Sequence, residues 1–186
     1  MKIKIYKKNI QTSFEEVVPF FMEAKDYFYE LKIPKKTEQC HYLSAKSIET
    51  VYLIKKIIEE YGTIHNLNCL VFSINRKNAQ HIINLKNKEY IKNVEFTVST
   101  IRNKAEDENI NSYKMLIRQN NIKLRFAYSH AKIILAKTEN DYFIIETSAN
   151  LINAAKYEHY VISNDKKLYE YYQMAISKIE DKSFEQ

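Results

Sequence analysis

The amino-acid sequence predicts an α/β fold, an α/β/α sandwich in which helices cover both faces of a central mixed β-sheet. Three observations support this prediction. Short apolar runs typical of strands alternate along the chain with longer segments whose apolar residues recur at helical spacing. Several strand-like runs follow one another after residue 120, so we expect a mixed rather than purely parallel sheet. The 186 residues fit one domain over 1–186, without internal repeat or linker.

The first half of the chain is predicted to begin with a strand and a helix. In residues 2–7 Lys alternates with Ile or Tyr, which indicates a short edge strand. A helix is predicted over 19–31, with Pro19 at its start, where proline is tolerated. The capping box Ser13-x-x-Glu16 allows an earlier start, but that helix would contain Pro19. The next predicted elements are strand 38–43, helix 47–61, strand 67–74, helix 76–87 and strand 93–99.

The second half is predicted to contain more strands than helices. A helix is expected over 104–119, followed by strands near 121–127, 131–137 and 141–147, and by a short strand that contains Glu158. The last helix, 165–180, has the clearest helical periodicity. Its predicted apolar face consists of Leu168, Tyr171, Tyr172, Ala175 and Ile179.

Composition and charge narrow the possible environments and partners. The formal net charge of +6 suits a polyanionic partner such as nucleic acid, because Lys and Arg displace counterions from phosphates, although charge alone is only permissive. Cys40 and Cys69 lie in apolar runs without CxxC spacing, so we interpret them as reduced core residues. No apolar run approaches the roughly 18–20 residues that span a bilayer, and the N-terminus lacks a secretory h-region. We therefore expect a cytoplasmic protein without a membrane partner.

Five polar residues between 130 and 158 are the candidates for chemistry. His130 and Lys132 are two residues apart on a predicted strand and therefore project to the same face. Ser148 and Asn150 stand in the same relation at the end of the next predicted strand. If these strands form a hairpin, all four side chains converge at one edge of the sheet, and Glu158 follows within reach on a third strand.

These residue types suit phosphoryl transfer. A histidine attacks phosphorus or protonates a leaving oxygen near neutral pH. Lys132, Ser148 and Asn150 are suited to hold the non-bridging oxygens of a phosphate, and Glu158 to fix the tautomer of His130 by accepting its second ring N–H. Three of these residues also have a structural alternative: His130 as a strand-end histidine, Lys132 as a solvated residue, and Asn150 as the cap of a short helix near 151–156.

The same stretch resembles a known family. His-Ala-Lys at 130–132 and Thr-Ser-Ala-Asn at 147–150 are similar to the H-x-K…G-S-x-N signature of phospholipase D-like proteins. Glu158 matches the acidic residue that follows this signature in the single-motif nuclease branch. The resemblance covers residues 38 to 180 and leaves the first 37 unaligned.

Two positions depart from the family pattern. Lys137 stands where the family has Asp, and Asp141 is the nearest substitute. Thr147 stands where the family has the Gly before Ser. In the family, that Asp is regarded as mainly structural, and the Gly allows close approach of the backbone.

The resemblance implies a metal-independent phosphodiesterase that needs no cofactor. One histidine forms a phosphohistidine intermediate, while a second protonates the leaving group and then activates water. Since this chain contains one motif, the second would come from another copy in a two-fold symmetric homodimer. We expect an endonuclease, with DNA favoured over RNA as the substrate. The alternative is a catalytically degenerate nucleic-acid-binding module on the same fold; phospholipid hydrolysis or transfer ranks last.

The remaining histidines and basic residues give weaker signals. His41 and His65 lie near cysteines, but neither spacing matches a zinc site, so we expect core packing and no metal. His81 and His159 have no partner pattern. Four basic residues precede the motif and fit either a nucleic-acid groove or a solvated helix face: Lys114, Arg118, Lys123 and Arg125.

Overall fold

The computed structural model describes residues 11–14, 31–44, 49–101, 108–151 and 158–182. The predicted strand 2–7, nearly all of the predicted helix 19–31 and the predicted short helix near 151–156 lie outside these ranges. The described elements are β1 (Gln11–Phe14), β2 (Glu38–Ser44), α2 (Thr50–Tyr61), β3 (Ile64–Val71), α3 (Arg76–Asn87), β4 (Ile91–Ser99), α4 (Glu108–Gln119), β5 (Lys123–Ala127), β6 (Ile133–Lys137), β7 (Tyr142–Thr147), β8 (Glu158–Asn164) and α5 (Lys166–Ser177).

The strands form one mixed sheet in the order β1-β2-β8-β7-β6-β3-β4-β5. Strands β3, β4 and β5 are parallel to one another, as are β1 and β2. Strand β6 is antiparallel to β3 on one side and to β7 on the other, and β8 is antiparallel to β7 and β2. The predicted hairpin is thus present, with Ile133 paired to Glu146.

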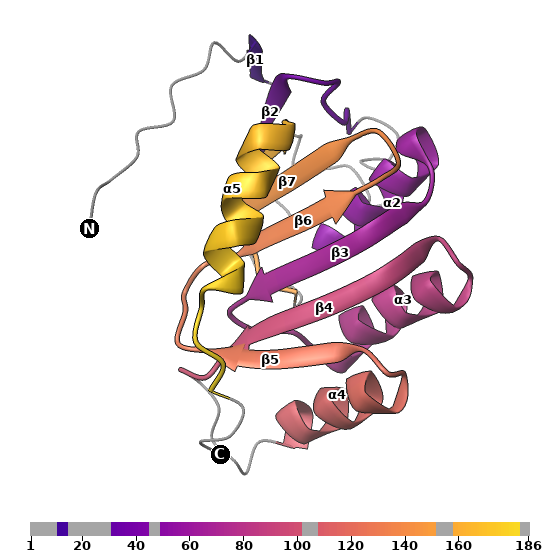
Figure 1. The fold of residues 1–186 in the computed structure, drawn as a ribbon, viewed down its shortest axis with the longest axis vertical. Helices are drawn as coiled ribbons and strands as arrows, with labels where there is room; N and C mark the ends of the chain where they lie inside the picture. The colour runs from indigo at the N-terminus through magenta and orange to yellow at the C-terminus, as the bar shows by residue number, and fades with distance from the viewer. Residues whose placement is uncertain (1–10, 15–30, 45–48, 102–107, 152–157, 183–186) are drawn as a thin grey trace.

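Helices cover both faces of this sheet, which confirms the predicted fold class (Figure 1). Helices α2, α3 and α4 lie against one face, over the larger hydrophobic cluster, whose fully buried members include Phe96, Phe143 and Tyr160. Helix α5 lies on the other face, over a smaller cluster on β3, β6 and β7. Successive buried residues of β6 and β7 point to opposite faces of the sheet, so the same two strands supply both clusters.

The inward face of α5 differs in part from the prediction. Leu168, Tyr172 and Ile179 do pack on the smaller cluster, but Tyr171 is 45% exposed. The most deeply buried residues of the helix are Tyr169 and Ile176. Because Tyr169 and Ile176 are seven residues apart, they share one stripe with Tyr172, and the predicted Tyr171 and Ala175 fall on its solvent side.

The C-terminal segment after α5 lies along the outer edge of β5. The backbone N–H of Lys182 donates to the carbonyl of Phe126 at 2.8 Å, and the N–H of Phe126 donates to the Asp181 carboxylate at 3.2 Å. The Arg125 guanidinium donates to the carbonyl of Ile179. The bonds from Lys182 and to Asp181 occupy the backbone carbonyl and N–H of Phe126 on the outer side of β5.

Both cysteines are buried thiols outside any disulfide, as predicted: Cys40 on β2 and Cys69 on β3. Burial raises the pKa of the Cys69 thiol. Among the described helices, none is long and apolar enough to cross a membrane.

The cap of α5 gives a test of how this helix is held. The Asp165 carboxylate accepts hydrogen bonds from the N–H groups of Lys167 and Leu168 at 2.8 and 3.1 Å. Asp165→Ala should lower the free energy of unfolding by about 1 kcal/mol, because two N–H groups lose their acceptor. Asp165→Asn should lose less, since its amide oxygen still accepts. Urea denaturation measures both, and equal losses in the two variants would contradict the capping role.

Candidate active site at one edge of the sheet

The sheet topology brings the five predicted residues to one edge. Because β6 runs opposite to β3 and β7, its amino end meets their carboxyl ends. His130 and Lys132 immediately precede β6. Ser148 and Asn150 follow β7, and Glu158 begins β8. Three separate segments therefore reach the same edge of the sheet.

Backbone hydrogen bonds join these segments. The N–H of Thr147 donates to the carbonyl of Lys132 at 3.2 Å, which holds the H-x-K segment beside the end of β7. The N–H of Ser148 donates to the carbonyl of His159 at 3.0 Å, which holds the end of β7 beside the start of β8. The relative positions of the candidate residues thus follow from the sheet itself.

His130 and Lys132 precede the strand on which they were predicted. Strand β6 begins at Ile133, and residues 128–132 form a crossing segment between β5 and β6. Since β3 and β4 lie between those two strands, the crossing segment passes over their carboxyl ends. His130 is consequently exposed at the edge instead of being held within the ladder.

An aromatic ring at the end of β3 supports both residues of the H-x-K segment. The ring of Phe72 stacks on the His130 imidazole, with 4.6 Å between centroids and 18° between planes. The Lys132 ammonium lies 5.5 Å from the centroid of the same ring and donates to the His130 carbonyl at 3.2 Å. Phe72 had no signal in the sequence, because its contact depends on β3 and β6 being neighbours.

Ser148 and Glu158 form a second part of the site. The Ser148 hydroxyl donates to the Glu158 carboxylate and accepts from the backbone N–H of His159 at 2.9 Å. Ser148 is exposed and Glu158 is half-buried. The predicted contact of Glu158 with His130 stays a prediction, since the carboxylate is used here by Ser148.

Asn150 is tied to the connection after β3. Its side-chain oxygen accepts from the Ser73 N–H at 3.2 Å, and the N–H of Leu151 donates to the Ser73 carbonyl at 3.1 Å. Asn150 and His130 thus contact adjacent residues, Ser73 and Phe72. The amide NH₂ of Asn150 is not used in this contact.

The two departures from the family pattern have different locations. Asp141 lies at the opposite edge, in the β6–β7 turn, where its carboxylate accepts from the Asn164 amide at 2.9 Å. Lys137 is at the same far edge, with its ammonium 5.5 Å from the Tyr142 ring centroid. Thr147 lies within the site, and its hydroxyl oxygen accepts from the Ala149 N–H at 2.8 Å. Asp141 is therefore not part of the constellation.

The four basic residues before the motif do not form one surface. Lys123 and Arg125 lie within 3.2 and 3.5 Å of Glu95, and Arg125 is also 3.8 Å from Asp181. Lys114 is on α4, at the other face of the sheet, and burial, followed by the charge of Arg118, lowers its pKa. The structure therefore favours separate roles for these basic residues, in packing and in ion pairs, and does not favour a single nucleic-acid groove.

A histidine pair lies on the α5 face close to Ser148. The rings of His41 and His159 are 6.0 Å apart, and burial, followed by repulsion from His159, lowers the pKa of His41, against a smaller raising effect of Glu146. The nearby Glu146 carboxylate accepts a 2.6 Å hydrogen bond from Tyr172. Within the described ranges, no three His, Cys, Asp or Glu side chains are grouped to hold a metal ion.

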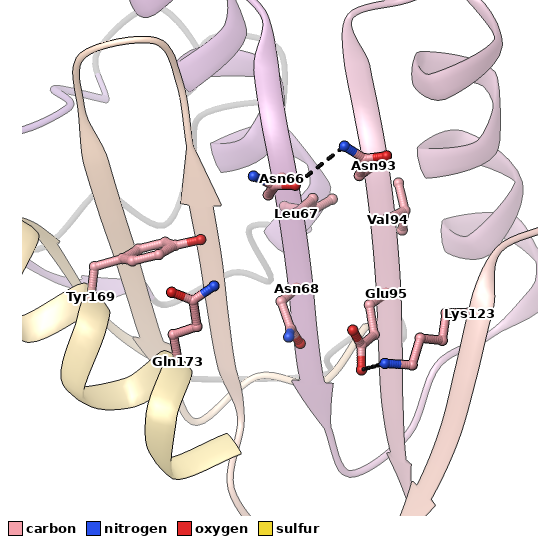
Figure 2. Close-up of a pocket in the computed structure, with 9 residues that line it drawn as sticks. All are labelled: Asn66, Leu67, Asn68, Asn93, Val94, Glu95, Lys123, Tyr169 and Gln173. Carbon is pink, nitrogen blue, oxygen red and sulfur yellow. Dashed lines mark hydrogen bonds and ion pairs between the residues drawn. The ribbon is translucent and has the colours of Figure 1, made fainter. Parts of the chain in front are cut away.

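A polar pocket on the α5 face lies apart from the five predicted residues (Figure 2). Its volume is about 270 Å³, and Tyr169 and Gln173 reach from α5 toward it. The Glu95–Lys123 ion pair and a hydrogen bond between Asn93 and Asn66 cross its floor. Its residues are Asn66, Leu67, Asn68, Asn93, Val94, Glu95, Lys123, Tyr169 and Gln173.

No protein-family model and no curated protein sequence matches the chain. Among solved structures, polyphosphate kinase from Porphyromonas gingivalis is similar with a TM-score of 0.55 and 12% identity, over 73% of this chain and 25% of that chain. Phosphatidylserine synthase from Haemophilus influenzae Rd KW20 gives 0.49 and 14%, over 74% and 37%. The archaeal chromatin protein TrmBL2 gives 0.48 and 16%, over 85% and 61%.

The polyphosphate kinase is a phospholipase D superfamily member. The chain spans about a quarter of the length of the polyphosphate kinase. At 12% identity the likeness concerns the fold, and it shows that the mixed sheet and its helices form a phospholipase D-like α/β fold.

The stacking of His130 on Phe72 gives a direct test of the site geometry. Protons above an aromatic face resonate upfield, so a ring proton of His130 should move downfield in Phe72→Leu, which keeps an apolar side chain but has no ring. Because Phe72 is only partly buried, we expect a loss of about 1 kcal/mol of folding stability. Histidine NMR spectra, assigned with His130→Gln, measure the shift. His65, at the start of β3, is the control, and an unshifted His130 would contradict the stack.

Proposed function

We propose that the chain is a metal-independent phosphodiesterase, an endonuclease, in which His130 is the nucleophile. One observation carries the proposal: His130, Lys132, Ser148, Asn150 and Glu158 come from three segments and lie at a single edge of a phospholipase D-like sheet. A structural role for each residue separately would not require them to share an edge.

The proposed reaction has two displacement steps. A ring nitrogen of His130 attacks phosphorus, the bond from phosphorus to the leaving oxygen breaks, and a second histidine donates a proton to that oxygen. The same second histidine then takes a proton from water, whose oxygen attacks phosphorus and releases His130. The Lys132 ammonium and the Asn150 amide would hold the non-bridging oxygens, on which negative charge increases.

The second histidine is proposed to be His130 of another copy. The chain carries one H-x-K segment, and its His130 is exposed at the sheet edge, where a two-fold axis would bring two such residues together. Glu158 has a second carboxylate oxygen besides the one that accepts from Ser148, and this oxygen would orient an imidazole. In this proposal the complete site exists only in the homodimer.

Nucleic acid is the proposed substrate, with DNA favoured over RNA. The net charge of +6 supports association with a phosphodiester polymer. A second candidate function, a nucleic-acid-binding module without turnover, is favoured by the absence of a carboxylate at position 137 and by the use of Asp141 at the opposite edge. The two functions predict different effects of replacing His130 on the rate of DNA cleavage and on the affinity for DNA.

Chelation and one substitution test the proposal. Purified protein should cut plasmid and single-stranded DNA in excess EDTA, because its catalytic charges come from side chains. His130→Ala should lower the rate by on the order of 10³-fold or more while leaving the affinity for DNA largely intact. Gel electrophoresis and fluorescence anisotropy measure the two quantities.

His81→Ala, on helix α3, replaces a histidine that is not among the five candidate residues, and as the matched control it should retain activity. Failure of the folded, dimeric protein to cut either DNA would reject the nuclease. In the binding module, His130→Ala would instead change affinity or have no effect.

Mixed dimers test whether the site is shared. If both copies of His130 are needed, a randomly assorted equal mixture of wild-type and His130→Ala chains should retain about one quarter of the wild-type activity. Independent sites would retain about one half. Co-refolded mixtures, with the dimer confirmed by sedimentation, distinguish the two values, and one half would contradict the shared site.

A further inference from the structure

The crossing segment 128–132 forms the rim of the candidate site. It connects Ala127 at the end of β5 to Ile133 at the start of β6, across three inter-strand spacings, or about 14 Å. The six steps from Ala127 to Ile133 could reach about 20 Å, so the segment crosses the carboxyl ends of β4 and β3 with slack, and it bends at Tyr128. Its residues therefore lie at the edge that carries His130.

This segment is held at both ends and in its middle. The N–H of Thr100 donates to the Ala127 carbonyl at 2.9 Å, and the Lys132 carbonyl accepts from β7. Between them, the N–H of Ala131 donates to the Ser129 hydroxyl at 3.1 Å, and His130 stacks on its aromatic support. The backbone of this segment therefore has a defined position beside His130.

Tyr128, on this anchored rim, is the most exposed tyrosine among the residues that the structure describes. It is 80% exposed, whereas Tyr90 and Tyr171, the next most exposed, are at 48% and 45%. Tyr90 lies between α3 and β4, and the ring of Tyr171 contacts that of Tyr172. Tyr128 is two residues from His130, so the Cα atoms of the two residues are at most about 7 Å apart.

We infer that Tyr128 is a stacking platform for an unpaired base next to the scissile phosphate, and that the substrate is single-stranded nucleic acid or a strand with unpaired nucleotides. This inference rests on the proposed function for the position of the phosphate. An exposed ring stacks on any base, because every base has a π-face. Bases inside a duplex are stacked on their neighbours, so they reach such a ring only after unstacking.

The neighbouring charges agree with this substrate. Lys132, at the other end of the segment, provides the cation for a phosphate, and His130 lies between it and Tyr128. Aromatic and cationic groups in this alternation are how sequence-tolerant proteins hold a single strand. The rim thus supplies a contact for the base and a contact for the backbone on either side of the nucleophile.

Binding measured in the His130→Ala background tests the inference independently of turnover. The probes are a fluorescent 12-nucleotide single strand, an abasic strand of the same length, and the corresponding duplex. Adding Tyr128→Ala should weaken binding of the base-bearing strand by about 5- to 30-fold. The abasic strand and the duplex should lose less than about 2-fold, since neither presents a free base. Tyr128→Phe should bind as the parent does, because the ring is kept.

Tyr90→Ala is the matched control and should leave all three affinities unchanged, since its ring is remote from the rim. Equal weakening of base-bearing and abasic strands would overturn the inference. Loss of the dimer in Tyr128→Ala, seen by sedimentation, would also overturn it, because the ring would then belong to the contact between copies. If wild-type protein cuts no strand but Tyr128 shows the base-dependent loss, the nuclease proposal fails and the base contact stands.

Discussion

The antiparallel position of β6 between β3 and β7 is the constraint on which the candidate site depends. It makes the start of one strand coincide with the ends of two others, so residues 58 positions apart, Phe72 and His130, contact each other. A parallel β6 would place its amino end, and with it the H-x-K segment, at the opposite edge from Ser148. The ladder hydrogen bonds of the sheet core therefore hold the site together more than any contact between the candidate side chains.

The order of strands and helices could be predicted from the sequence because these signals are local. Helix α3 matches its predicted range, since Asn75 caps it and its apolar residues recur at helical spacing. Strand β3 begins earlier than predicted, at Ile64, because Asn66 and Asn68 interrupt the apolar run while facing the open side of the sheet. The predicted inward face of α5 was partly wrong. Tyrosines occupy both the buried and the exposed sides of this helix, so the sequence pattern did not distinguish the two sides.

The candidate site could also be predicted from the sequence, but only where its residues lie close together in the chain. The β6–β7 hairpin is local, so the approach of His130 and Lys132 to Ser148 could be predicted from spacing. Phe72 and Ser73 could not, because the β3–β6 pairing joins segments more than 60 residues apart and no short pattern encodes it. The hydrogen bond of Glu158 is with Ser148 and was predicted with His130. The choice between these partners depends on side-chain orientation, which the spacing of residues in the sequence does not determine.

The C-terminal segment along β5 has a consequence for assembly. An exposed sheet edge is a template on which a second chain can add a strand. Here Lys182 and Asp181 already occupy the backbone carbonyl and N–H of Phe126, near the end of the edge strand. A strand of a second copy could not pair with Phe126 without first displacing residues 181 and 182. The same contacts protect this part of the edge against edge-to-edge aggregation.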